Sequence, residues 1–193
     1  IRKRAEVRDI TMNPSTRLYY VEVQEPDMHE PSGDLERLIA ALRNEWDLPD
    51  LAIEFNVLSA LQPVLRKGEW KVTCAVHMGD DLSGPRIIQI WPGFHDGALY
   101  GVAVDLGSTT IAAHLCDLKT GEVVASSGLM NPQIRFGEDL MSRVSYSMMN
   151  AGGDKEMTLA VREGMNALFA EIAQQAEIEI EQIVDAVFVC NPV

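Results

Sequence analysis

The stretch that decides the fold is Gly101-Val-Ala-Val-Asp-Leu-Gly-Ser-Thr-Thr110, an apolar run that ends in a carboxylate and a turn. Gly107 allows a phosphate to approach the backbone closely because it has no Cβ. The amides and hydroxyls of residues 108–110 can donate to phosphate oxygens. Asp105 would repel phosphate, so its natural role is to bind Mg²⁺ or its waters, or to order the attacking nucleophile. The pattern predicts a phosphate-binding hairpin, although an ordinary Asp-x-Gly-Ser turn could use the same residues for conformational reasons alone.

Apolar segments around this stretch predict three consecutive strands, two helices and a further strand. We expect Asp154 to cap the second helix. The order β-β-β-α-α-β is typical of an RNase H-like half-domain of the ASKHA superfamily of actin-like ATPases. The expected strands are 99–104, 111–116, 123–127 and 183–190, the last one buried, and the expected helices are 138–148 and 157–175.

The first half of the chain has its own pattern of elements. We expect a strand at 18–23, a helix that begins with Asp34 as its cap, and a short helix at 56–61 that Pro63 interrupts or restarts. A hairpin is expected to follow, with strands over 70–78 and 86–91. The Pro- and Gly-containing segment 92–97 is the best candidate boundary. The sequence therefore predicts an α/β protein, with a small α+β middle domain over residues 1–97 and a partial ASKHA domain over residues 98–193.

Charge and hydropathy exclude several classes of partner. Lys and Arg number 16 against 29 Asp and Glu, which gives a net charge of −13. Such a chain would be repelled by nucleic acid. No apolar run approaches the roughly 18 to 20 residues that span a bilayer, and no signal core follows the basic start, so we expect a cytoplasmic protein without a membrane partner. Because Ile1 is not an initiator Met and Val193 closely follows an apolar run, we expect the chain to be part of a longer one.

The isolated polar and sulfur-containing side chains have structural interpretations. Cys74, Cys116 and Cys190 show no metal-binding spacing and are expected to be buried apolar residues. The methionines of the second half are expected to pack in the core. Asp139 and Arg143 lie four residues apart on an expected helix, which favours an exposed salt bridge. The methionines concerned are Met141, Met148, Met149, Met157 and Met165.

Three segments of the second half resemble one branch of the ASKHA superfamily, the reductive activators of corrinoid proteins. They are the segment from Tyr100 to Leu118, Asn131-Pro-Gln133, and Phe136-Gly-Glu-Asp-Leu-Met-Ser-Arg143. Arg17-Leu-Tyr-Tyr-Val-Glu-Val23, Gly33-Asp-Leu-Glu-Arg-Leu38 and the strand from Trp70 are similar to that family's linker and middle domain. The resemblance covers essentially the whole chain. Ser108 stands where relatives often have Thr, which keeps the hydroxyl.

The resemblance implies an enzyme that couples binding and hydrolysis of ATP with Mg²⁺ to the one-electron reduction of a Co(II) corrinoid to Co(I), which restores methyl transfer. Its partner would be a corrinoid protein or a cobalamin-dependent methyltransferase. The electron would come from an N-terminal ferredoxin domain with a 2Fe-2S cluster. That domain and motifs beyond Val193 are not in this chain, so the chain alone is expected to be inactive, and its catalytic residues for hydrolysis are not identified. The candidate nucleotide-binding residues are Asp105, Gly107, Ser108, Thr109, Thr110 and Asn131, with Asp105 also holding Mg²⁺ through water.

Two other interpretations remain open. A sugar or acid kinase of the same superfamily would share the hairpin, but such kinases generally place it near the start of the chain. Alternatively, the first half could be a non-catalytic module that forms a homodimer through its sheet edge or its first helix. Asn131 could line the ligand cleft or simply end the third strand.

Overall fold

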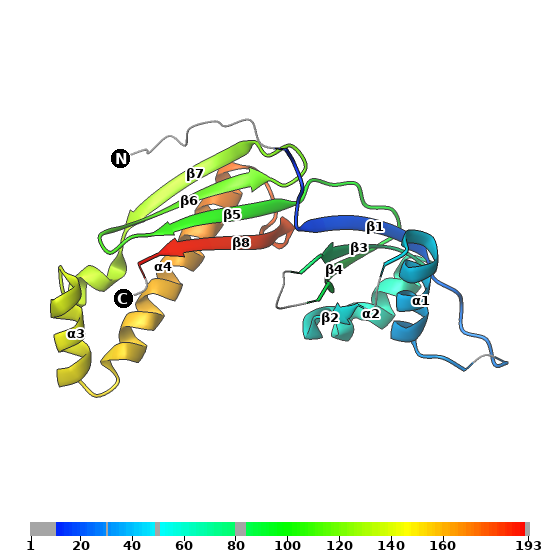
Figure 1. Ribbon diagram of the computed structural model, residues 1–193, viewed down its shortest axis with the longest axis horizontal. Coiled ribbons are helices and arrows are strands. Elements are labelled where there is room, and N and C mark those ends of the chain that lie inside the picture. Colours follow the sequence, from blue (N-terminus) through cyan, green and yellow to red (C-terminus); the bar gives the residue numbers. More distant parts are fainter. Residues whose placement is uncertain (1–10, 30, 49–50, 80–83, 192–193) are drawn as a thin grey trace. The chain divides into compact units, whose positions relative to one another are not determined.

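The computed structural model describes residues 11–29, 31–48, 51–79 and 84–191. The chain divides into two compact units (Figure 1). One unit comprises residues 13–97, and the other comprises the described residues 11–12 and 98–191. Each unit has a separate hydrophobic core.

The first unit is a four-stranded sheet of order β1-β3-β4-β2 with two helices packed on it. β3 pairs antiparallel with both β1 and β4, which confirms the expected hairpin, and β2 pairs parallel with β4. The core between helices and sheet contains fully buried Leu38, Leu42 and Leu65. The elements are β1 (Thr16–Glu22), α1 (Asp34–Trp46), β2 (Ala52–Ile53), α2 (Phe55–Lys67), β3 (Lys71–His77) and β4 (Arg86–Pro92).

The starts of α1 and α4 differ from the expected ones. Gly33, and not Asp34, is the N-cap of α1, and its backbone N–H donates to Glu36 Oε2 at 2.6 Å. Asp34 lies in the first turn, where its carboxylate pairs with Arg37 and Arg66. Both predicted caps were wrong, because α4 likewise begins at a glycine and places Asp154 in its first turn. An acidic residue stabilises a helix start from a position in the first turn as well as from the cap, so the sequence does not distinguish the two positions.

Pro63 does not interrupt α2. The helix is continuous from Phe55 to Lys67 with Pro63 inside it. Pro63 has no N–H to donate to the carbonyl of Ser59. The buried residues Val57, Leu61 and Leu65 hold the helix on the sheet on both sides of the proline, so packing overrides the local cost.

The second unit is a sheet of order β7-β6-β5-β8, with α4 across one face (Figure 1). β5, β6 and β7 are antiparallel neighbours, and β8 pairs parallel with β5. This arrangement confirms the predicted RNase H-like fold and the inclusion of the hairpin, 123–127 and 183–190 in one sheet. The elements are β5 (Tyr100–Leu106), β6 (Thr110–Asp117), β7 (Val123–Met130), the 3-10 helix η1 (Pro132–Phe136), α3 (Leu140–Met149), α4 (Gly153–Gln175), the 3-10 helix η2 (Ile180–Gln182) and β8 (Ile183–Cys190).

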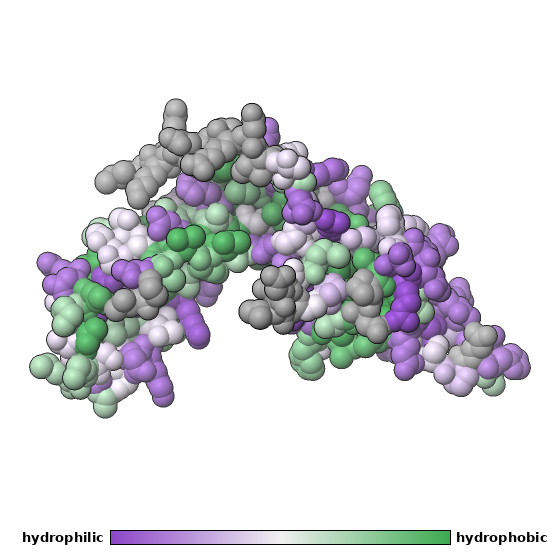
Figure 2. Space-filling model, viewed as in Figure 1, coloured by the Kyte–Doolittle hydropathy of each residue, from purple (hydrophilic) through white to green (hydrophobic). Residues whose placement is uncertain are grey.

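β8 is an exposed edge strand, so its predicted burial was wrong. Val187, Phe188 and Val189 are 61%, 46% and 66% exposed, and Figure 2 shows apolar side chains at the surface over this strand. Among the described residues, only β5 pairs with β8. An apolar sequence predicts a core strand, but its position in the sheet decides whether neighbours cover it.

The sulfur-containing residues also divide by position. Cys74 is buried, and burial raises the pKa of its thiol to about 12. Cys190 is exposed, so the prediction that it is buried was wrong. The expected core packing of the methionines also fails on α3, because three of them are more than two-thirds exposed: Met141, Met148 and Met149.

None of the described helices is long and apolar enough to cross a membrane.

The packing of α1 on its sheet predicts a stability difference between two leucines. Leu42 is fully buried on α1, whereas Leu58 on α2 is 43% exposed. Leu42→Ala should lower the free energy of unfolding by about 2 to 5 kcal/mol, because it removes buried methyl groups and leaves a cavity. Leu58→Ala should cost less than about 1 kcal/mol. Chemical denaturation of both variants measures the difference, and equal losses would contradict the placement of this core.

Candidate nucleotide-binding site

The tip of the β5–β6 hairpin is closed by Gly107. Its backbone N–H donates to the carbonyl of Thr110 at 3.0 Å. A Cβ on residue 107 would lie 2.6 Å from that carbonyl oxygen. The turn therefore requires glycine for its own closure, as well as for any approach by a ligand.

The carbonyl groups of three consecutive residues at the tip are engaged by the rest of the unit. Asn131, directly after β7, donates its Nδ2 to Gly107 O at 2.9 Å and its backbone N–H to Thr109 O at 2.8 Å. Arg143 of α3 donates Nη2 to Ser108 O at 2.6 Å. These bonds fix the peptide planes of the turn.

The N–H groups of Ser108 and Thr109 remain available. Within the described ranges, the structure records no hydrogen bond from either group. The side chains of Ser108, Thr109 and Thr110 are exposed beside them. Successive backbone N–H groups with neighbouring hydroxyls form a concavity suited to an anion. The predicted hairpin residues are thus brought together in a geometry that fits a phosphate group.

Asp105 lies at the end of β5 and is exposed. It alternates with the buried Val102 and Val104, so its side chain is on the opposite face of the sheet from theirs. Among the described residues, no three His, Cys, Asp or Glu side chains form a group that could hold a metal ion. A single carboxylate still suits Mg²⁺, which usually keeps several waters and binds phosphate oxygens. The place of Asp105 is therefore compatible with its predicted role through water.

Asn131 is 3% exposed, and both ends of its side-chain amide are occupied. Nδ2 binds the hairpin, and Oδ1 accepts from the backbone N–H of Gln133 at 2.9 Å. This geometry makes Asn131 a residue that positions the turn. Its direct contact with a nucleotide stays a prediction.

Arg143 is the important residue whose place the sequence interpretation missed. It is 8% exposed, and its Nε donates to Gly137 O at 2.9 Å. Among the described residues, Asp139 forms no ion pair with it and instead caps α3, accepting from the backbone N–H of Ser142 at 2.7 Å. The expected exposed salt bridge was wrong because Asp139 lies before the helix and Arg143 inside its buried side.

The cap of α3 leaves an electrostatic signature. Donation by the Ser142 backbone N–H holds the pKa of Asp139 below its ordinary value. At the far end of α3, the hydroxyl of Tyr146 donates to Glu156 Oε2, and this bond raises the pKa of Tyr146. α3 is thus fixed to the turn at one end and to α4 at the other.

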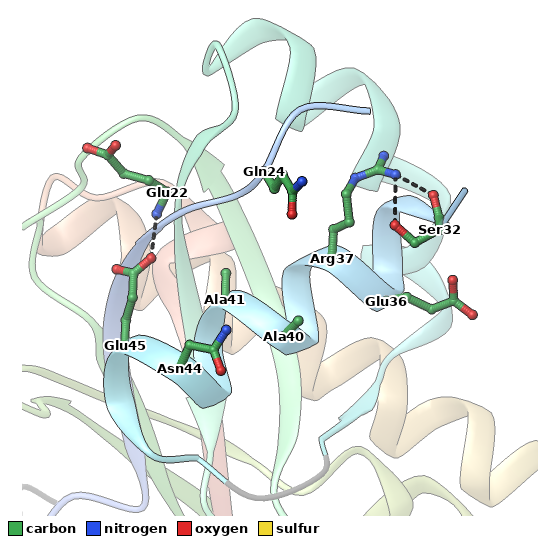
Figure 3. A pocket seen from close by; sticks show the side chains of 9 residues that line it. All are labelled: Glu22, Gln24, Ser32, Glu36, Arg37, Ala40, Ala41, Asn44 and Glu45. Carbon is green, nitrogen blue, oxygen red and sulfur yellow. Dashed lines mark hydrogen bonds between the residues drawn. The ribbon is translucent and has the colours of Figure 1, made fainter. Parts of the chain in front are cut away.

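The first unit contains a separate cavity of about 410 Å³ (Figure 3). Arg37 lines it, but its Nη1 donates to the backbone and hydroxyl oxygens of Ser32. None of the predicted site residues lines this cavity. The lining residues are Glu22, Gln24, Ser32, Glu36, Arg37, Ala40, Ala41, Asn44 and Glu45.

The sheet, the hairpin and its turn define an RNase H-like domain of the ASKHA class. Family models identify the branch: the RACo linker region matches residues 5–97, and the RACo middle region matches residues 100–193. These two regions account for nearly the whole chain, which therefore belongs to the RACo family of corrinoid reductive activators. The family's middle region is the one that carries the hairpin.

Two relatives are similar to this chain. The corrinoid activation enzyme RamQ of Eubacterium limosum is 28% identical over 111 residues, which are 57% of this chain and 19% of that protein. A solved structure of a reductive activator for corrinoid, iron-sulfur protein has 29% identity and a TM-score of 0.78, covering 96% of this chain and 29% of that one. The chain therefore spans less than a third of either relative.

The two bonds of the Asn131 side chain predict a stability cost. Asn131→Ala should lower the free energy of unfolding by about 1 to 3 kcal/mol, because it leaves the Gly107 carbonyl and the Gln133 N–H without their partner. Asn150→Ala is the control, since Asn150 is exposed and donates to Tyr146 O at the end of α3. Denaturant titration of both variants tests this, and an equal effect would refute the role of Asn131.

The cap of α3 predicts a pH dependence. Because the pKa of folded Asp139 is depressed, its stabilisation is complete above the unfolded value of about 3.9 and disappears as pH falls through the folded value. Amide-exchange protection in α3 should fall over that range. Asp139→Asn should keep the cap without this titration, because asparagine caps well. Identical pH profiles for the two proteins would show that the carboxylate does not stabilise α3.

Proposed function

We propose that a protein of full family length containing this chain binds Mg-ATP at the hairpin tip, hydrolyses it, and thereby drives reduction of a Co(II) corrinoid to Co(I). The observation that carries the proposal is the turn itself. Its carbonyls are bound by Asn131 and Arg143, while the N–H groups of Ser108 and Thr109 remain available. The corrinoid is proposed because the chain belongs to the RACo family.

The residues of this chain have distinct roles in the proposal. The N–H groups of Ser108 and Thr109 donate to phosphate oxygens, and the neighbouring hydroxyls add donors. Asp105 holds Mg²⁺ through water, and the ion supplies positive charge that offsets the charge of the phosphates. Water attacks the terminal phosphorus, and ADP and phosphate leave. Residues that lie outside this chain complete the cleft.

The redox step transfers one electron. A ferredoxin domain outside this chain would hold the 2Fe-2S cluster, which would supply the electron that reduces Co(II) to Co(I). The Co(II) corrinoid is the substrate, carried by a corrinoid protein or a cobalamin-dependent methyltransferase. ATP would act through a conformational equilibrium that its binding and hydrolysis shift.

A sugar or acid kinase would use the same hairpin. The match of residues 5–97 to the RACo linker region favours the activator, because it describes the residues that precede the hairpin.

The proposal predicts a selective loss in Asp105→Ala of the full-length protein. ATP-dependent activation should fall about 100-fold or more, because the carboxylate holds the metal that offsets phosphate charge. Reduction of the ferredoxin cluster should be unchanged. The assay follows the loss of Co(II) absorbance with reductant in excess. Thr109→Val should lose only about 5-fold, since the backbone N–H remains.

Glu122→Ala is the matched control. Glu122 is exposed in the β6–β7 turn, at the other end of β6 from the hairpin tip, and the substitution also removes one negative charge. Its activity should equal that of the unmodified protein. Undiminished activation by Asp105→Ala would refute the role proposed for the hairpin.

A further inference from the structure

Arg143 carries a buried charge with an unusual set of partners. Its guanidinium donates to Gly137 O, to Ser108 O and, at 3.5 Å, to Gln133 Oε1. All three partners are neutral. Across the described part of the chain, no carboxylate lies within ion-pair distance of Arg143.

A buried charge is costly, and proteins normally pair it. The exposed carboxylate of Asp139 attracts Arg143, and this attraction adds to the Ser142 hydrogen bonds in lowering the pKa of Asp139, but the two side chains form no ion pair. Here the charge lies directly behind the turn whose N–H groups suit an anion. A neutral donor could bind the Ser108 carbonyl without that cost. The position of the guanidinium is explained if a negatively charged ligand on the turn offsets its positive charge.

We infer that Arg143 is a positioning residue for the phosphate groups: it holds the Ser108 carbonyl away from the ligand and supplies a positive charge that the phosphates offset. The inference rests on the proposed nucleotide site. It assigns a role in binding to α3, the helix that carries Arg143.

The shape of the guanidinium is suited to this role. Nε and Nη2 bind the carbonyls of Gly137 and Ser108 at 2.9 and 2.6 Å. These two donors belong to one rigid plane, so the segment before α3 and the hairpin are held at a fixed spacing. A lysine would keep the charge but would present a single ammonium group on a flexible chain.

The same bonds couple α3 to the ligand. Asp139 caps α3, and Gly137 lies beside the cap, so a turn ordered by phosphate also orders the start of α3. Because coupling between two sites is reciprocal, nucleotide should increase amide-exchange protection in the first turns of α3.

The test uses the full-length protein with Arg143→Met, Arg143→Lys and a control, Arg135→Met. Arg135 is an exposed arginine of η1 that lies over the Phe136 ring, so the control removes an equal charge without touching the turn. Affinity for ATP, ADP and adenosine is measured by calorimetry. The nucleotide-induced rise in melting temperature is measured against each variant's own baseline.

We expect Arg143→Met to weaken ATP and ADP binding by about 10- to 100-fold, as for loss of charged hydrogen bonds, and to leave adenosine affinity unchanged. Arg143→Lys should lie between it and the unmodified protein, and it also serves if the methionine variant does not fold. Arg135→Met should stay within about 2-fold.

The outcomes separate the two proposals. An unmodified protein that does not bind ATP would overturn the proposed function and this inference with it. ATP binding by the unmodified protein together with equal binding by both Arg143 variants would overturn only the role of Arg143. An equal loss for ATP and adenosine would also overturn it, because a merely structural residue would affect both alike.

Discussion

The candidate site depends on hydrogen bonds to three carbonyl groups at one turn. A hairpin tip presents both polar groups of each peptide, and a carbonyl that faced a phosphate would repel it. In this chain the carbonyls of residues 107–109 are bound by Asn131 and Arg143, and the N–H groups of Ser108 and Thr109 stay available. The C=O of one residue and the N–H of the next residue lie in one plane and point in opposite directions. A hydrogen bond to the carbonyl therefore also sets the direction of that N–H.

These bonds make the turn dependent on segments that follow it in the chain. Asn131 follows β7, η1 leads to Gly137, and α3 supplies Arg143. Both glycines leave space for a close contact. A Cβ at residue 107 would lie 2.6 Å from Thr110 O, and a Cβ at residue 137 would lie 2.6 Å from Ser142 Cβ. A movement of α3 would therefore act on the turn through Arg143.

The exposed apolar surfaces concern a different property of the chain. β8 has neighbours on one side only within the described residues, and α3 exposes Met141, Met148 and Met149. Contiguous apolar surface commonly marks an interaction site. The chain spans less than a third of each relative to which it is similar.

The sequence by itself determined the longer strands, the hairpin and the motif from Asp105 to Thr110, because alternation, helical spacing and turn residues are local signals; the two-residue strand β2 was not predicted. Local signals also suggested caps at Asp34 and Asp154 and a break at Pro63, where neighbouring glycines and packing on the sheet prevailed. Only the tertiary structure decided which apolar residues are covered, as β8 illustrates. It also decided that Arg143 reaches Ser108, 35 residues earlier in the chain. Hydrogen bonds between distant segments leave no periodicity in the sequence, since their partners are set by how the elements pack.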